Sequence, residues 1–301
     1  MTEQRKPWHG VNTATALPLN EDLSVDFDAF ADHVAWLASN GTDGVCPNGS
    51  LGEYQTLSDE ERARVVTTAV EASPDGFGVM PGVGAYGTLQ SVRWIEQAVN
   101  AGAQSVLLLP PNTYRADRES VLTHYRTAAK VGLPVVAYNN PIDTKVDLVP
   151  SLLAQLFDEG LIVAVKEFSG DVRRAWEIKE LAPDLDLLIG SDDVVVELGL
   201  AGAVGWIAGY SNAFPQASAE LLRLSTSGQR SDLDQALPIY RDLHSLLRWD
   251  SKTEFVQAIK LSMDLVGRKG GLCRPPRSPL SAEIRAALTA ATEAAIAKGY
   301  K

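Results

Sequence analysis

Cysteine and histidine are scarce in this sequence of 301 residues, and no long uninterrupted apolar run is present. The two cysteines, Cys46 and Cys273, are too few for a disulfide framework or a cysteine-rich metal site. The four histidines are scattered without the spacing of metal ligands. We therefore expect neither a disulfide-stabilised fold nor a bound metal.

Positive charge is also in short supply. The sequence has 27 Lys and Arg residues against 38 Asp and Glu residues, so its formal net charge is −11. Because no basic cluster offsets the repulsion from phosphate, we expect no nucleic-acid partner. The acidic excess is most simply explained as a contribution to solubility.

Membrane-spanning and targeting segments are not expected either. The stretch with the most membrane-like composition, residues 194–214, is broken by Glu197 and by several glycines. This pattern favours a helix followed by a short buried strand over a membrane span. The first ten residues carry charge without a following apolar core, which argues against a signal peptide and favours a cytoplasmic location.

What the sequence does contain is a regular alternation of short apolar runs and stretches with helical periodicity. Strands are predicted at residues 11–17, 44–47, 78–82, 105–109, 134–138, 162–166, 187–189 and 205–207, followed by helices at 26–40, 58–72, 88–101, 118–131, 149–157, 172–181, 194–201 and 215–227. Eight such units in residues 1–230 predict a closed (β/α)8 barrel. Residues 231–301 show helical patterns only and are predicted to form an all-helical C-terminal extension.

One lysine stands at the end of the sixth apolar run. Residues 161–170 read Leu-Ile-Val-Ala-Val-Lys-Glu-Phe-Ser-Gly, which is typical of a strand buried on both faces. Burial of Lys166 should lower its pKa and make the neutral amine available as a nucleophile toward carbonyls. Taken alone, the residue is more simply explained as a strand-end lysine that extends to water.

Active sites of such barrels lie at the carboxyl ends of the strands, so the residues after the other strands are informative. Residues 47–53, Pro-Asn-Gly-Ser-Leu-Gly-Glu, form a glycine-bracketed turn whose amides and Ser50 hydroxyl could bind a carboxylate. Tyr138 ends the fifth strand, where it could transfer protons or simply pack. Gly190 opens a run of small and acidic residues after the seventh strand. Each feature alone is weak evidence for a site.

A glycine-rich motif offers a competing interpretation. Residues 82–87 match G-x-G-x-x-G, follow a strand and open a helix, as in a dinucleotide site. However, the next strand ends in Pro-Pro-Asn-Thr rather than in an acidic residue that binds ribose, and the motif lies in the third unit. We therefore reject a dinucleotide site.

Taken together, the strand-end motifs resemble the dihydrodipicolinate synthase and N-acetylneuraminate lyase superfamily of class I aldolases. The motifs occur in the order Gly-Ser-Leu-Gly-Glu, Gly-Val-Gly-Ala, Tyr-Asn-Asn-Pro, Val-Lys-Glu-Phe-Ser-Gly, Gly-Ser-Asp-Asp and Arg-Pro-Pro-Arg-Ser-Pro. The resemblance covers essentially the whole chain, including the helical extension. It implies a homotetramer built from two tight dimers.

The resemblance implies a role for each matching residue. Lys166 would form a Schiff base with the keto carbon of a small 2-oxo acid such as pyruvate, and Tyr138 would move protons. Ser50 and Leu51 would hold the substrate carboxylate. The pocket would be lined by Gly190 and Ile207. No metal or organic cofactor is implied, because the iminium formed on lysine is itself the electron sink.

Three positions depart from the pattern of the synthases. Ser50 and Leu51 replace two threonines, so one hydroxyl of the proton relay is lost. Thr113 stands where a relay tyrosine normally lies, unless Tyr114 takes its place. Asp143 stands where an arginine would bind the carboxylate of the aldehyde partner, and an aspartate would repel that group.

These departures favour a lyase that dehydrates, deaminates or cleaves a small 2-oxo acid. Examples are a keto-deoxy sugar acid dehydratase and the deaminase of hydroxyproline breakdown. A first alternative is dihydrodipicolinate synthase activity, which condenses pyruvate with aspartate semialdehyde. A second alternative, of another class, is a non-catalytic barrel that binds a metabolite.

Overall fold

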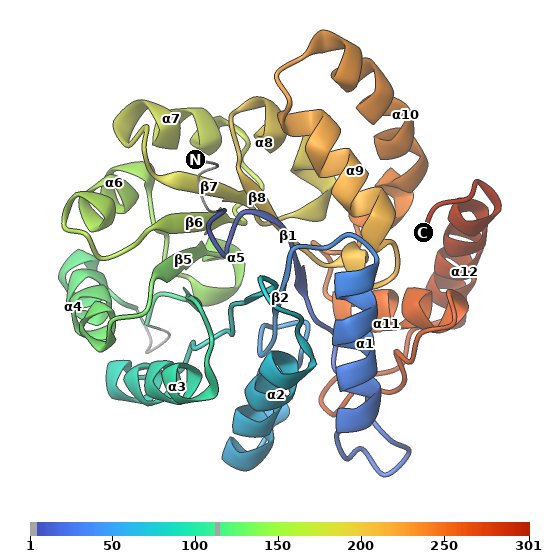
Figure 1. Ribbon diagram of the computed structural model, residues 1–301, viewed down its shortest axis with the longest axis horizontal. Coiled ribbons are helices and arrows are strands. Elements are labelled where there is room, and N and C mark those ends of the chain that lie inside the picture. The colour runs from blue at the N-terminus through green and yellow to red at the C-terminus, as the bar shows by residue number, and fades with distance from the viewer. Residues whose placement is uncertain (1–4, 112–114) are drawn as a thin grey trace.

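The structure is a computed structural model that describes residues 5–111 and 115–301. Its centre is a sheet of parallel strands in the order β3-β2-β1-β8-β7-β6-β5-β4. The strands are β1 (Gly10–Ala14), β2 (Gly44–Cys46), β3 (Gly78–Val79), β4 (Val106–Leu108), β5 (Val135–Asn139), β6 (Ala164–Glu167), β7 (Asp186–Ile189) and β8 (Gly205–Ala208). Figure 1 looks along the barrel, with helices around the strands.

The two end strands of the sheet, β3 and β4, close the barrel through backbone contacts of residues near the strands. Gly82 and Leu107 form an isolated parallel bridge, and the amide of Val83 donates to the carbonyl of Leu107 at 3.0 Å. The predicted (β/α)8 barrel is therefore confirmed. Among the described strands β3 is the shortest, because Pro81 and the glycines that follow it interrupt regular pairing.

The barrel helices are amphipathic and cover the outside of the sheet. They are α1 (Phe27–Ser39), α2 (Asp59–Ala72), α3 (Thr88–Ala101), α4 (Arg118–Ala128), α6 (Pro150–Asp158), α7 (Arg173–Leu181), α8 (Val195–Leu200) and α9 (Pro215–Thr226). The predicted capping box of α2 is present, since the Ser58 hydroxyl accepts from the Glu61 amide while Glu61 accepts from the Ser58 amide. One additional turn, α5 (Pro141–Thr144), was not predicted.

Two apolar layers result from this arrangement. The larger fills the space between the sheet and the surrounding helices. A smaller cluster fills the barrel interior, with members such as Met80, Leu107, Val136 and Leu188. Residues of the interior alternate along each strand with residues that face the helices, as a closed parallel barrel requires.

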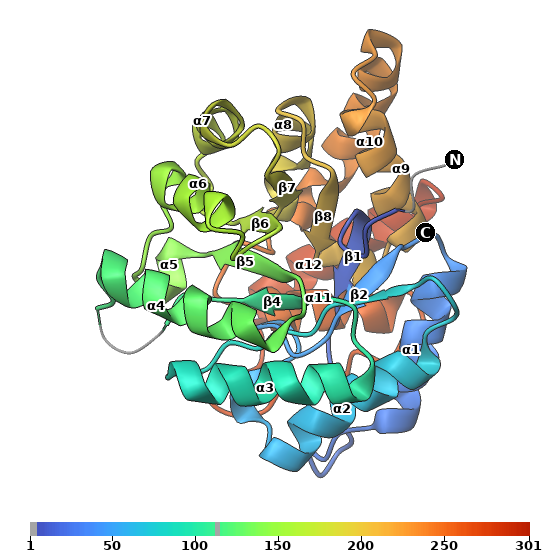
Figure 2. The same ribbon diagram turned by 60° about the vertical axis from the view of Figure 1, so that its left-hand side comes forward.

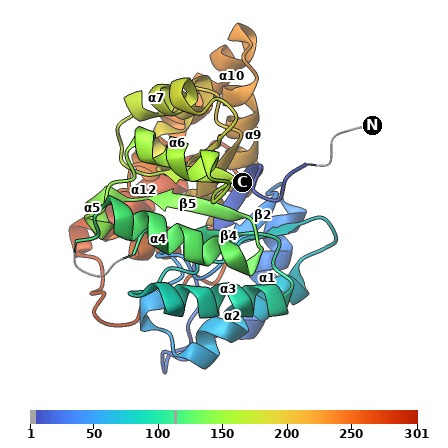
Figure 3. The ribbon, with the colours of Figure 1, turned by 90° about the vertical axis from the view of Figure 1, so that its left-hand side faces the viewer.

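The C-terminal helices are α10 (Arg230–Leu247), α11 (Phe255–Leu265) and α12 (Ala282–Ala297). Helix α10 packs against α9, and α12 packs against both α10 and α11. Figures 2 and 3 show that α11, α12 and the connection between them lie toward the end of the barrel where α5 stands. Among the helices in the described residues, none combines the length and apolar character needed to cross a membrane.

The described residues before β1, residues 5–9, lie at the opposite end of the barrel (Figure 3). There the carboxylate of Asp186, the first residue of β7, accepts hydrogen bonds from Lys6 Nζ at 2.9 Å and Trp8 Nε1 at 2.8 Å. His9 Nε2 lies 2.8 Å from the same oxygen.

Candidate active site

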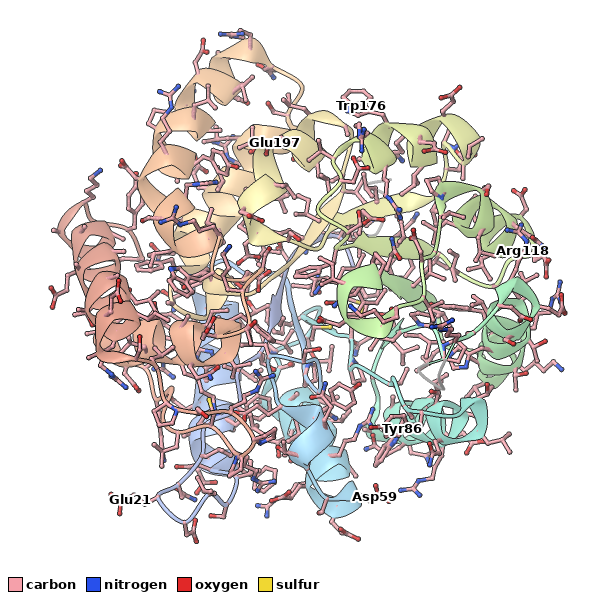
Figure 4. The ribbon with its side chains drawn as sticks, turned by 180° about the vertical axis from the view of Figure 1, so that it is seen from behind. Glu21, Asp59, Tyr86, Arg118, Trp176 and Glu197 are labelled. Atoms are coloured by element: carbon pink, nitrogen blue, oxygen red, sulfur yellow. The ribbon has the colours of Figure 1, made fainter. Side chains whose placement is uncertain are left out.

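A cavity of about 430 Å³ opens at the carboxyl ends of the strands. Six of the residues singled out from the sequence line it: Ser50, Leu51, Tyr138, Asp143, Lys166 and Ile207. Figure 4 looks onto this end of the barrel, with α5 in front and the labelled Arg118 and Trp176 at its periphery. The structure thus gathers residues from the carboxyl ends of four strands, β2, β5, β6 and β8, and the segments after them into one cavity.

Lys166 and Tyr138 occupy paired positions on neighbouring strands. In the register of β5 with β6, Tyr138 stands opposite Lys166. Both side chains are nearly buried, with 6% of Lys166 and 7% of Tyr138 exposed. Lys166 Nζ lies 4.4 Å from the centre of the Tyr138 ring and 5.5 Å from that of Phe168. The amine and the phenol can therefore act on the same small ligand.

The pKa of Lys166 does not move in the direction predicted from burial. Burial does lower it, but the negative charge that Tyr138, Asp250, Cys46 and Asp192 can carry outweighs this effect and raises the pKa above the usual lysine value. The prediction of a lowered pKa is therefore wrong. At neutral pH the group is an ammonium ion, which must lose a proton before it can attack a carbonyl.

Tyr138 is held in its neutral form and is oriented by Asn140. Burial raises the pKa of Tyr138, while the nearby Lys166 opposes this shift, so the phenol keeps its proton at neutral pH. Asn140 Nδ2 lies 3.3 Å from the Tyr138 hydroxyl and donates to Asp143 Oδ2 at 2.8 Å. The sequence analysis missed Asn140, although its place before the one-turn helix α5 was a signal for a capping residue.

The turn after β2 is held in place by contacts of Glu53 with the C-terminal extension. Glu53 has a positive φ of 52° and is buried, and its Oε1 accepts from Lys260 Nζ of α11 at 2.7 Å. Its other oxygen accepts from the backbone amide of Arg274 at 2.9 Å. The turn places Ser50 and Leu51 at the cavity. This loop is therefore attached to the C-terminal helices.

One predicted site residue, Gly190, does not line the cavity, and another, Thr113, cannot be compared with it. Gly190 lies at the end of β7 against β6, where an added Cβ would come within 2.3 Å of the Glu167 carbonyl oxygen. It does not line the cavity that the structure forms around Lys166. Thr113 and the neighbouring Tyr114 lie outside the described residues.

The C-terminal extension contributes side chains that the sequence analysis missed. Asp250, Lys252 and Arg277 all line the cavity. Burial raises the pKa of Asp250 well above its usual range, and repulsion from Asp192 adds to this shift, while Lys166 opposes it. The sequence analysis searched the residues that directly follow predicted strands, and these three residues lie in the helical extension instead. Their charge was the only feature of the sequence that could have suggested a role in the site.

The glycine-rich motif at residues 82–87 is occupied by a protein side chain. The Arg62 guanidinium donates to the carbonyl oxygens of Gly82 and Gly84 at 3.1 and 3.0 Å. It also stacks on Tyr54 and Trp94, with 4.9 and 4.3 Å to the ring centres. These contacts give the motif a structural role in the packing of Arg62.

An (β/α)8 barrel with a buried lysine beside a tyrosine at the carboxyl ends of its strands has the architecture of a class I, Schiff-base-forming lyase. Comparison with known proteins is consistent with this class. The sequence model of the dihydrodipicolinate synthetase family matches residues 7–295. The chain therefore belongs to the dihydrodipicolinate synthetase family, and it is a class I lyase.

Individual relatives match most of the length of the chain. A 4-hydroxy-tetrahydrodipicolinate synthase of Methanosphaerula palustris is 32% identical over 286 residues, which cover 94% of this chain and 97% of the relative. An uncharacterized DapA-like lyase of Rhizobium meliloti is 31% identical over 276 residues, covering 91% and 92%. The crystal structure of dihydrodipicolinate synthase from Aquifex aeolicus has a TM-score of 0.90 at 27% identity, covering 97% and 99%.

Proposed function

We propose that this lyase acts on a small 2-oxo acid, with Lys166 as the nucleophile and Tyr138 as the acid and base. The observation that carries the proposal is the pairing of the two side chains across β5 and β6 at the cavity, with Lys166 Nζ 4.4 Å from the Tyr138 ring centre. A nucleophilic amine needs a proton donor and acceptor within reach of the same carbon, and this pair supplies both.

The first half of the reaction forms the iminium. After Lys166 has lost its proton, its lone pair attacks the keto carbon and the C–N bond forms. Tyr138 moves a proton from the nitrogen to the former carbonyl oxygen, which gives a carbinolamine. Tyr138 then gives its own proton to this hydroxyl, which leaves as water, and the nitrogen lone pair completes the C=N bond.

The second half uses the iminium as an electron sink. The Tyr138 phenolate removes a proton from the carbon next to the iminium, and the C–H electrons form an enamine. The enamine then expels a hydroxyl or amino group from the following carbon, and this group leaves with a proton as water or ammonia. Hydrolysis of the product imine restores the Lys166 amine.

The substrate carboxylate next to the keto carbon is assigned to the turn that contains Ser50 and Leu51. Both residues line the cavity together with Lys166. Backbone amides of a tight turn and one hydroxyl form a suitable anion-binding group. The buried contact between Glu53 and Lys260 keeps this turn in place.

Within the class, Asp143 favours a dehydratase or a deaminase. Asp143 lines the cavity and accepts a hydrogen bond from Asn140. A carboxylate in this place suits a substrate hydroxyl or a cationic nitrogen, and it would repel the carboxylate of an aldehyde partner. A keto-deoxy sugar acid dehydratase and the deaminase of hydroxyproline breakdown are reactions of this kind.

Borohydride trapping tests the proposal. Hydride reduces an iminium to a stable amine, so incubation with a panel of 2-oxo acids and borohydride should modify a peptide that contains Lys166. The peptide should gain the mass of the 2-oxo acid less one oxygen atom, because water leaves when the imine forms. Lys166→Ala should abolish the adduct, whereas the exposed control Lys130→Ala should retain it. Absence of an adduct with every 2-oxo acid would overturn the proposed mechanism.

Tyr138→Phe tests the second role. Loss of the phenol should slow turnover by roughly 10²- to 10⁴-fold, because general acid-base catalysis contributes about that much. The iminium should still be trapped, since water can replace Tyr138 in the slower formation of the adduct. Unchanged turnover of a confirmed substrate by Tyr138→Phe would contradict the role of Tyr138.

A second candidate is condensation of pyruvate with aspartate semialdehyde. It is favoured by the relatives named 4-hydroxy-tetrahydrodipicolinate synthase, at 32% and 31% identity. Purified protein should be assayed with both compounds, with an authentic synthase as a positive control. Efficient condensation would show that Asp143 does not exclude the aldehyde partner and would replace the dehydratase or deaminase proposal.

A further inference from the structure

Two cations from the C-terminal extension reach the cavity. Lys252 belongs to the connection between α10 and α11, and Arg277 belongs to the connection between α11 and α12. Both line the same cavity as Lys166. Two cations beside a catalytic cavity are notable in a chain of formal net charge −11, because they create a local attraction for anions.

Arg277 has no carboxylate partner among the described residues. Its guanidinium stacks on Phe255, with 5.1 Å to the ring centre, and its backbone amide donates to the Arg274 carbonyl. The planar guanidinium carries donors suited to bidentate binding of a carboxylate. These donors are therefore available to a ligand in the cavity.

Arg274, in the same segment, differs from Arg277 because its guanidinium is fully engaged with protein groups. Its guanidinium makes a bidentate ion pair with Glu61, at 2.7 and 2.6 Å, and donates to the carbonyl oxygens of Thr56 and Leu23. Its backbone amide donates to Glu53. Arg274 thus anchors the segment to the barrel, and this anchored segment presents Arg277 to the cavity.

The position of Arg277 fits the far end of a ligand rather than its keto carbon. A second cavity, of about 660 Å³, adjoins the first and shares Gln55, Thr253 and Arg277 with it. Arg277 therefore stands at the boundary between the two cavities, whereas Lys166 lies at the strand ends. A ligand that extends from Lys166 toward the extension passes Arg277.

We propose that Arg277, assisted by Lys252, binds a second carboxylate of the substrate, so that the enzyme acts on 2-oxo acids that carry a carboxylate at both ends. This inference rests on the proposed Schiff-base function. Asp143 stands where the synthase pattern has an arginine, so that wall of the cavity lacks the expected cation. Arg277 supplies a cation from the extension instead. Asp143 and Asp250 then face the middle of the substrate, where hydroxyl or amino groups can bind them.

Trapping with matched pairs of ligands tests this specificity. The probes are 2-oxoadipate against 2-oxohexanoate, and 2-oxoglutarate against 2-oxopentanoate, which differ only in the distal carboxylate. We expect half-maximal trapping at concentrations roughly ten- to hundredfold lower for the dicarboxylate, the range of a charge-assisted hydrogen bond. Arg277→Gln should reduce this ratio at least tenfold, Lys252→Gln should reduce it less, and Arg277→Lys should restore part of it.

The matched control is Arg285→Gln, which removes the same charge from an exposed position of α12 outside the cavity. This variant should keep the wild-type ratio. Equal trapping of both members of each pair by the wild type, or an unchanged ratio in Arg277→Gln, would overturn the inference while leaving the Schiff-base proposal intact. Failure to trap any 2-oxo acid, pyruvate included, would overturn the Schiff-base proposal itself. Circular dichroism of each variant verifies that the compared proteins are folded.

Discussion

The charge on Lys166 depends on side chains from several elements. Tyr138 comes from β5, Cys46 from β2 and Asp250 from the C-terminal extension. Burial raises the pKa of Cys46 to about 12, so its thiol stays neutral near pH 7. Burial also raises the pKa of Tyr138, so its phenol keeps its proton near pH 7. Of these three neighbours, the carboxyl group of Asp250 is therefore the one whose removal should change the protonation of Lys166 most directly.

Asp250→Asn should move the pH dependence of adduct formation to lower pH. The nucleophile is the neutral amine, so the rate rises with pH up to the pKa of Lys166. That pKa is raised in part by Asp250, so removal of the carboxylate should lower it. The initial rate of borohydride trapping with pyruvate, measured from pH 6 to pH 10, gives the profile.

Asp184→Asn provides the control for this substitution, because Asp184 is an exposed carboxylate between α7 and β7. Its profile should coincide with that of the wild type. A profile for Asp250→Asn that stays in place, or moves to higher pH, would show that Asp250 does not set the charge of Lys166.

At the scale of single residues, the sequence predicted which side chains meet but not their protonation. Lys166 and Tyr138 could be placed because both end apolar runs of a barrel, and strand ends converge. The predicted direction of the Lys166 pKa shift was wrong, because that pKa depends on Tyr138, Asp250, Cys46 and Asp192. None of the four is close to Lys166 in sequence, so no local pattern could reveal their combined effect.

Secondary structure was predictable where local signals were strong. The helix predicted at residues 88–101 occurs as α3 (Thr88–Ala101), and the capping box of α2 is present. By contrast, α5 is a single turn of four residues, too short for hydrophobic periodicity to show. Only its capping residue and proline marked it.

A buried ion pair connects the elements on which the site depends. Glu53 follows β2, and Lys260 lies in α11; the two side chains are 2% and 1% exposed. Lys260 Nζ also donates to the Leu272 carbonyl at 2.6 Å. Because both charged groups are buried, each serves as the counter-charge of the other. Removal of one group leaves the other charge buried without a partner.

Glu53→Gln should lower the free energy of unfolding by about 3–5 kcal/mol, because it leaves the Lys260 ammonium buried without its counter-charge. For a chain of 301 residues the thermal midpoint should fall by roughly 5 to 8 °C. Differential scanning fluorimetry measures this change. The double variant Glu53→Gln with Lys260→Met should recover part of the loss, since no uncompensated charge remains.

The surface pair Arg223 and Glu220 provides the comparison for Glu53→Gln. Its side chains are 58% and 45% exposed, and Glu220→Gln should change stability by about 1 kcal/mol or less. Equal effects of Glu53→Gln and Glu220→Gln would contradict the importance assigned to the buried pair.

At the scale of the whole molecule, the barrel was predictable and the placement of its extension was not. Eight alternations of short apolar runs and amphipathic helices fit few folds other than a (β/α)8 barrel. The contacts of the extension are made by single side chains across long sequence separations, such as Arg274 with Glu61. Such contacts leave no periodic pattern, so the contribution of the extension to the cavity became visible only in the fold.

The two buried histidines should make stability depend on pH. Burial lowers the pKa of His33 and of His124 to about 4 in the folded chain, against 6.5 for the free side chain. His33 Nε2 lies 3.0 Å from Asn212 Oδ1, while its Nδ1 has no hydrogen-bond partner among the described residues. A second proton on the His33 ring therefore has no acceptor.

The direction of the pH effect follows from proton binding by the two states. Between about pH 6.5 and pH 4 the unfolded chain protonates both histidines and the folded chain does not, so stability present above pH 6.5 is lost as the pH falls. Each histidine should contribute a slope of up to about 1.4 kcal/mol per pH unit. Urea unfolding of wild type, His33→Gln and His124→Gln at pH 7.0, 6.0 and 5.0 measures this slope. Other titrating groups cancel in the comparison, so each variant should lose stability less steeply than the wild type; parallel lines would contradict the assignment.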